Sequence, residues 1–245
     1  MPNRHPFAAV LVGLLGLTLA LTGCASARPQ RDDPGNASYT LVTLVSGPNS
    51  GSGTKDERQA MFRGHMANIN RLVETGELLM AGPFGNPTDP TWRGLFVLDI
   101  SDPAMAGALV ATDPGVISGE FAARVRPMQA SSTLRQSLAL YRALEAEQAA
   151  SASDATAPPT LMRAYVILTA ADVERAARAV RESRFTIVWQ GRFTDGDGNG
   201  GVIVVDATEP ASVRNALPAA ASGPCVIDGW FSTASHVRLP EAARR

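Results

Sequence analysis

Residues 94–103 read GLFVLDISDP, and the pattern returns as GVIVVDATEP at residues 201–210. A run of branched and aromatic residues predicts a strand, and a proline at the first position of a helix sacrifices no hydrogen bond. Two further blocks also recur: LLMAG at 78–82 as TIVWQG at 186–191, and VISGEF at 116–121 as VIDGWF at 226–231. Because the blocks keep nearly constant spacing, we interpret the chain as an internal duplication.

The segments around the first block follow the order strand, helix, strand, strand, helix, strand. Thr54 and Glu57 form a capping-box pattern at the start of the first helix, and Gly76 is suited to end it. This order is the ferredoxin-like split unit. In the first copy we predict strands at 39–45, 77–81, 94–100 and 119–126 and a second helix at 104–111. In the second copy we predict strands at 163–169, 186–191, 201–206 and 226–231 and a helix at 171–183.

The domain layout follows from the repeats. The first copy spans 39–128, a helix over 129–148 and a proline-ended linker fill 129–160, and a degenerate second copy spans 161–240.

The N-terminus has the pattern of a secretory signal. An apolar run at 7–21 is shorter than the roughly 20 residues of a membrane-spanning helix, and small residues follow it. Leu21-Thr22-Gly23-Cys24 resembles the bacterial lipobox, in which the cysteine is acylated. We therefore expect a signal peptide at 1–23, a lipidated Cys24 that makes the membrane a partner, and a flexible tether at 24–38. The expected location is the bacterial cell envelope.

Composition narrows the function classes. Apolar residues make up 45% and charged residues 18% of the 245-residue chain, as in globular proteins. A net charge of −1 provides no basic face, so we expect no nucleic-acid partner. The two cysteines imply no disulfide framework, and we expect Cys225 to be a small buried hydrophobe. His236 and Trp230 fall on the expected last strand without a third ligand, so we expect neither a metal centre nor a cofactor.

Candidate residues for acid–base chemistry occur only in the first copy. His65 lies on its long helix, and Asp113 precedes Pro114. A histidine fixed by an aspartate can act as a general base near neutral pH. The alternative is that the histidine bonds the turn structurally and that Asp113 is only a turn starter. In the second copy no histidine falls near Val173, and Gly223-Pro224 replaces Asp113-Pro114.

Three segments of the first copy resemble the YCII-related domain family: Gly64-His65-Met66 with Asn70-Arg71-Leu72, LLMAGP at 78–83, and TDPGV at 112–116. The resemblance implies ferredoxin-like units that pair sheet to sheet as dimeric α+β barrels. It also implies an active site of His65 and Asp113, and the family includes a dehydrochlorinase of chlorinated hydroquinones. The chain departs from the family in a polar loop at 47–53 and at Gly115, where an aromatic residue is usual. We therefore expect an α+β protein whose two βαββαβ repeats close an intrachain barrel.

One segment has a competing interpretation. Residues 195–206 match an EF-hand loop in part, which would place calcium on Asp195, Asp197, Asn199 and Asp206. The flanking segments are predicted strands rather than helices, so we favour a polar hairpin loop.

Three function classes remain. The first is a lipid-anchored enzyme of lyase or hydrolase type that uses His65 and Asp113 on a small molecule. The second is a non-catalytic envelope lipoprotein that binds a small ligand or a protein partner. The third is a calcium-dependent module.

Overall fold

The computed structural model describes residues 35–151, 161–196, 198–217 and 222–242. The predicted signal peptide, Cys24 and most of the predicted tether lie outside the described residues. The tether prediction was wrong at its end, because the first strand begins at Asn36. In the described ranges, no helix is both long and apolar enough to cross a membrane.

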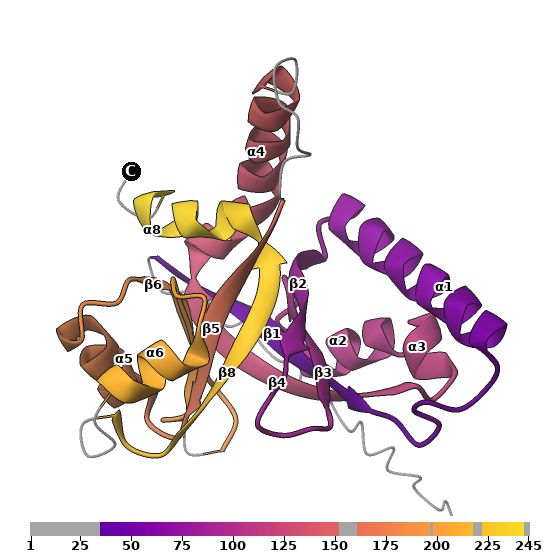
Figure 1. The fold of residues 1–245 in the computed structure, drawn as a ribbon, viewed down its shortest axis with the longest axis horizontal. Helices are drawn as coiled ribbons and strands as arrows, with labels where there is room; N and C mark the ends of the chain where they lie inside the picture. The colour runs from indigo at the N-terminus through magenta and orange to yellow at the C-terminus, as the bar shows by residue number, and fades with distance from the viewer. Residues whose placement is uncertain (1–34, 152–160, 197, 218–221, 243–245) are drawn as a thin grey trace, which may run out of the picture. The chain divides into compact units, whose positions relative to one another are not determined.

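The first repeat is an antiparallel sheet in the order β4-β1-β3-β2, covered on one face by helices (Figure 1). Thr54 and Glu57 form the predicted capping box at the start of α1. Alternation along the strands separates two faces: Tyr39 and Leu41 point to the inner cluster, whereas Val42 and Leu44 pack in the helix layer. The elements are β1 (Asn36–Ser46), α1 (Lys55–Glu74), β2 (Leu78–Gly85), β3 (Trp92–Leu98), α2 (Pro103–Val110), α3 (Pro114–Ile117) and β4 (Phe121–Ser131).

The second repeat has the corresponding order, β8-β5-β7-β6. Its outer helix layer rests on a separate buried cluster of small and branched residues, such as Ala176, Val180 and Ile203. The elements are β5 (Met162–Ala170), α5 (Val173–Glu182), β6 (Ile187–Phe193), β7 (Gly201–Val205), α6 (Pro210–Ala216) and β8 (Cys225–Thr233).

Details of the backbone confirm that the two repeats are copies. The register of β2 on β3 shifts between Leu78 and Met80, and that of β6 on β7 shifts between Ile187 and Trp189. Gly76 after α1 and Arg184 after α5 both have positive φ, of 79° and 65° respectively. A shared bulge and a shared helix end at matching places require the same local design in both halves.

The structural similarity between the two repeats extends beyond the segments predicted from the sequence. Each fourth strand runs into a 3₁₀ helix, η1 (Ser132–Gln136) or η2 (Ala234–Arg238). The hydroxyl of Tyr39 donates to the Ser131 carbonyl, and that of Tyr165 donates to the Thr233 carbonyl. The helix predicted over 129–148 was therefore wrong at its start, because β4 and η1 precede α4 (Ser137–Ser151). His236 lies in η2 rather than on the last strand, and α8 (Leu239–Ala242) follows it.

The two sheets close into one antiparallel barrel of eight strands, which confirms the expected α+β class and the intrachain barrel. One seam pairs Phe84 with Trp230 across β2 and β8, and the other pairs Met128 with Phe193 across β4 and β6. The first seam needs a glycine, because a Cβ on Gly82 would lie 1.7 Å from the carbonyl oxygen of Phe231. The inner faces of both sheets form one core in which Trp230, Tyr39 and Tyr165 are fully buried.

The two helix layers differ in a way that matters for function. Helix α5 buries small and branched side chains along its whole length, including Ala176, Ala177 and Val180. Helix α1 is longer, yet only His65 and Leu72 on it are buried. Helix α1 lacks this line of small residues, and residues 62–73 of it line a cavity over the sheet.

Candidate active site

His65 and Asp113 come together across two helices of the outer layer. His65 lies in the third turn of α1 and is 7% exposed, and Asp113 is fully buried at the N-cap of α3. The Nδ1 atom of His65 lies 2.9 Å from both carboxylate oxygens of Asp113. A Cβ on Gly64 would meet the Pro114 ring at 3.0 Å, so the small residue lets α1 and α3 approach. The pair inferred from the resemblance is therefore formed in the fold.

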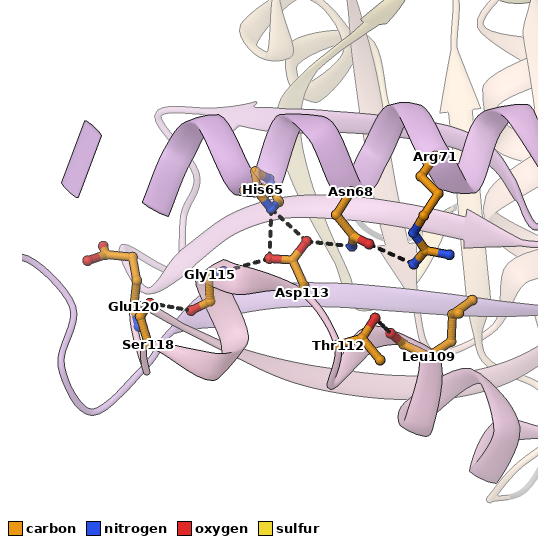
Figure 2. A network of polar contacts seen from close by, with 9 residues as sticks. All are labelled: His65, Asn68, Arg71, Leu109, Thr112, Asp113, Gly115, Ser118 and Glu120. Carbon is orange, nitrogen blue, oxygen red and sulfur yellow. Dashed lines mark hydrogen bonds and ion pairs between the residues drawn. The ribbon is translucent and has the colours of Figure 1, made fainter. Parts of the chain in front are cut away.

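The partners of Asp113 determine the protonation state of the pair (Figure 2). The Gly115 amide donates to Asp113 Oδ1 at 2.8 Å, and the Asn68 amide donates to Oδ2 at 2.9 Å. Asn68 is itself oriented by Arg71, whose Nη2 donates to Asn68 Oδ1 at 2.8 Å. Arginine can only donate, so the Asn68 NH₂ group must face the carboxylate.

Every other contact on Asp113 is thus a donor, which suits the ionised carboxylate. The carboxylate then accepts the Nδ1–H of His65, which leaves the Nε2 atom of the neutral ring with its lone pair. Burial alone would raise the pKa of Asp113. Hydrogen bonds from His65, Asn68 and Gly115, together with attraction to His65, outweigh burial and lower that pKa below its ordinary value.

Aromatic rings surround His65. Phe121 meets its ring edge-on at a centroid distance of 5.3 Å, Phe96 stacks at 6.1 Å and Phe62 lies tilted at 6.1 Å. Phe121 also explains the departure at Gly115, since a Cβ there would lie 2.4 Å from the Phe121 ring. The aromatic side chain that the family has after the Asp-Pro step would collide with Phe121, which instead supplies an aromatic contact from β4.

The ring of His65 forms part of the wall of a cavity of about 600 Å³. The cavity lies between α1 and β2 and extends to α4 and η2, where Tyr141 and His236 line it. Most of its wall is apolar, and Phe62 and Met66 on α1 contribute to it although they are 55% and 40% exposed. Because Asp113 engages Nδ1, Nε2 is the ring nitrogen left for a molecule in the cavity.

Sequence reasoning missed three residues of this site: Asn68, Phe121 and His236. Asn68 could have been found, because residues three apart on a helix share a face and Asn68 follows His65 by that spacing. Phe121 and His236 carried no local signal, since only the tertiary packing brings β4 and η2 to the cavity.

The calcium interpretation was wrong as a four-residue site. Asp195 and Arg126 form a two-bond ion pair, with the Nη2–Oδ1 distance at 2.7 Å, and Asp206 is paired with Arg163. Asp195 follows β6 in the loop, whereas Asp206 follows β7 at the far end of that strand. Strand β7 therefore separates the two carboxylates by roughly 16 Å at about 3.3 Å per residue. Asp197 lies outside the described residues, and the segment is the favoured hairpin connection.

Cys225 starts β8 and is a free, partly buried thiol that packs against the second helix-layer cluster. In the described part of the chain, no group of three or more histidine, cysteine or acidic side chains is placed to hold a metal ion.

Similar solved structures share little sequence with this chain, and one family model matches its first repeat. No curated protein matches the chain. A mutant chlorite dismutase from Candidatus Nitrospira defluvii aligns at 10% identity and a TM-score of 0.48, over 84% of this chain and 94% of that one. A double mutant of the same enzyme aligns at 11% identity and a TM-score of 0.46, over 87% of this chain and 97% of that one. The family model for the YCII-related domain matches residues 40–129, which is the part of the chain that holds His65 and Asp113.

Proposed function

We propose that the first repeat is an acid–base enzyme in which His65 takes a proton from a small molecule bound in the cavity. The observation that carries the proposal is a chain of hydrogen bonds that ends on the Asp113 carboxylate. Arg71 orients Asn68, which donates to Asp113, and Asp113 also accepts the Nδ1–H of His65. This chain makes Nε2 the basic atom, and His65 lines a cavity large enough for a substrate.

The chemistry follows from the geometry. His65 Nε2 accepts a proton from a C–H or O–H group, and the ring becomes an imidazolium. Asp113 stabilises the imidazolium through the Nδ1–H bond and keeps the ring in one orientation. The imidazolium can then return its proton to a leaving group, which gives an elimination, or the neutral ring can activate water, which gives a hydrolysis. The reaction class is therefore that of a lyase or a hydrolase.

The cavity supports a substrate with an apolar body. Its wall near His65 consists of Phe62, Phe96, Phe121 and Ile69, and its volume of about 600 Å³ is in the range of small-molecule sites. Aromatic rings beside the base favour a flat or cyclic substrate, which would stack against them.

The test is a two-step screen. A library of small cyclic compounds is screened by thermal shift, and each compound that raises the melting temperature is incubated with the protein in D₂O. We expect a bound compound to exchange a carbon-bound proton for deuterium, or to be hydrolysed, with the original protein and with Arg178→Gln, a control on the outer surface of α5. His65→Gln should abolish both reactions. Binding with neither deuterium exchange at carbon nor hydrolysis of any compound would favour the non-catalytic ligand-binding alternative, and either reaction surviving in His65→Gln would overturn the proposed role of the histidine.

We further propose that Cys24 is acylated and that the domain acts in the cell envelope. The support is the lipobox pattern of residues 21–24 directly after the apolar run at 7–21. Expression of the full chain in a bacterium should give a membrane-bound protein whose mass corresponds to an acylated Cys24 at the N-terminus. Cys24→Ser should lose the lipid mass; an unchanged mass and membrane fraction for that variant would refute the anchor.

A further inference from the structure

The duplication gives the second repeat a counterpart of the His65 cavity. A pocket of about 430 Å³ lies between α5 and β6, lined by residues from 186 to 192 of β6 and its approach. The shared bulges align these residues with the stretch of β2 that lines the first cavity. The positive-φ residues after α1 and α5 align Val73 with Arg181 and Met66 with Glu174. The second pocket is therefore the same groove between helix and sheet, built a second time.

The lining of the second pocket has changed from apolar to polar. Met66, Val73 and Ala81 of the first cavity correspond to Glu174, Arg181 and Gln190 in the second pocket. Arg181 Nη2 donates to Gln190 Oε1 at 3.0 Å, and Gln190 Nε2 donates to Glu174 Oε1 at 3.4 Å.

The His65 position is also changed. The same alignment puts Val173 where His65 stands, and the buried valine cannot exchange a proton. The second pocket therefore cannot carry out acid–base chemistry of the kind proposed for the first, and a role in binding does not depend on that proposal.

Two features of the second pocket's wall favour a negatively charged ligand. Arg181 and Arg192 outnumber Glu174, and among the described residues Arg192 has neither an ion pair nor a side-chain hydrogen bond. Trp189 lines the same pocket at 5% exposure, and no described group accepts from its buried indole N–H. Buried donors in native proteins nearly always have an acceptor, so this N–H indicates a partner that the chain itself does not provide.

We propose that this pocket binds a small carboxylic acid. Arg192 pairs with the carboxylate, because a guanidinium matches the two oxygens of that group in its plane. The apolar remainder of the ligand packs against Val188 and Leu239, which are buried in the same wall. The indole N–H of Trp189 donates to a ligand oxygen that enters beside it.

The test uses benzoate as the probe, with sodium chloride at equal ionic strength as the reference. Indole N–H resonances of the three tryptophans are followed by nitrogen-15 NMR, and Trp189→Phe identifies the Trp189 signal. We expect millimolar benzoate to move that signal in the original protein and in Arg178→Gln, which removes a charge from α5 outside the pocket. Arg192→Gln should weaken the response about tenfold, the effect of losing one charged contact.

Two results would overturn the proposal: no benzoate-specific movement of the Trp189 signal, or an equal response in Arg192→Gln and Arg178→Gln. The His65 ring signals provide a separate readout. Movement of those signals alone would place the acid in the first cavity and would likewise overturn the assignment to the second pocket.

Discussion

Replacement of His236 tests how the barrel responds to acid. The side chain is 1% exposed, its Nε2 lies 2.9 Å from the Ser232 hydroxyl, and its ring stacks on Trp230 at 6.0 Å. The ring of Tyr165 lies on it at a centroid distance of 6.0 Å. Burial in this environment lowers the pKa of His236 from 6.5 to about 4. The neutral ring is therefore the native form at physiological pH.

The sign of the effect follows from which state takes up the proton. Below an unfolded pKa near 6.5 the unfolded chain binds a proton at this histidine, whereas the native chain does not until the pH nears the folded value of about 4. The contribution of the neutral ring to stability is thus complete above pH 6.5 and is lost as the pH falls toward 4. One pKa unit corresponds to about 1.4 kcal/mol, so the full loss is about 3 kcal/mol and the loss between about pH 7 and pH 5 is about 2 kcal/mol.

Urea unfolding at about pH 7 and about pH 5 measures this loss. His236→Gln keeps a polar group near Ser232 but does not titrate, so its free energy of unfolding should fall by about 2 kcal/mol less than that of the original protein. Asp113 does not contribute to the difference between about pH 7 and about pH 5. Because its pKa is lowered in the native state, the stability it provides is lost only below its unfolded-state pKa of about 4. Equal losses in the two proteins would refute the assignment to His236, as would a His236 NMR signal that titrates near pH 6 to 7.

Three further substitutions, the last with a matched control, test the site and the barrel. Asp113→Asn leaves one oxygen for three donors and turns an NH₂ group toward Asn68. We expect the free energy of unfolding in urea to fall by about 2–4 kcal/mol and nitrogen-15 NMR to show His65 as the Nε2–H tautomer. A retained Nδ1–H tautomer would contradict the role given to the Asp113 carboxylate. Asn68→Ala removes one charged hydrogen bond and should cost about 1–2 kcal/mol while it slows deuterium exchange, and an unchanged exchange rate would separate Asn68 from the site. Gly82→Ala places a Cβ 1.7 Å from the Phe231 carbonyl oxygen, so the free energy of unfolding should fall by about 3 kcal/mol or more, as for a core defect. Its control, Gly107→Ala, has open space around it and should be neutral or stabilising by about 0.5–1 kcal/mol. Similar melting temperatures for both variants would contradict the tight β2–β8 seam.

The repeated strands could be predicted because each carries its own signal. Residues 94–98 and 201–205 are branched and aromatic runs in both copies, and Pro103 and Pro210 mark the helices that follow. The end of β4 could not be predicted in this way. Residues 129–131 have no strand pattern, and they are extended because the early start of β1 gives them partners, as in the pair Asn36 and Ser131.

The site shows the same division between local and tertiary information. The capping box that starts α1 is local and was predicted, whereas the pairing of His65 with Asp113 across 48 residues came only from the family resemblance. Phe121 takes over the place that an aromatic residue after the Asp-Pro step would fill, and only the packing of β4 against α3 reveals this. Cavity contacts such as that of His236 depend on closure of the barrel, which no short stretch of sequence encodes.

The two seams of the barrel join halves of one polypeptide. Ladders of only two and three residue pairs hold β2 to β8 and β4 to β6. Between separate subunits such short seams would form by a second-order encounter and would come apart on dilution. Within one chain their closure is a first-order step, driven by an effective concentration in the millimolar range for a short connection. The barrel should therefore stay assembled when very few copies are present, and each half can accept substitutions that an identical partner would have to carry twice.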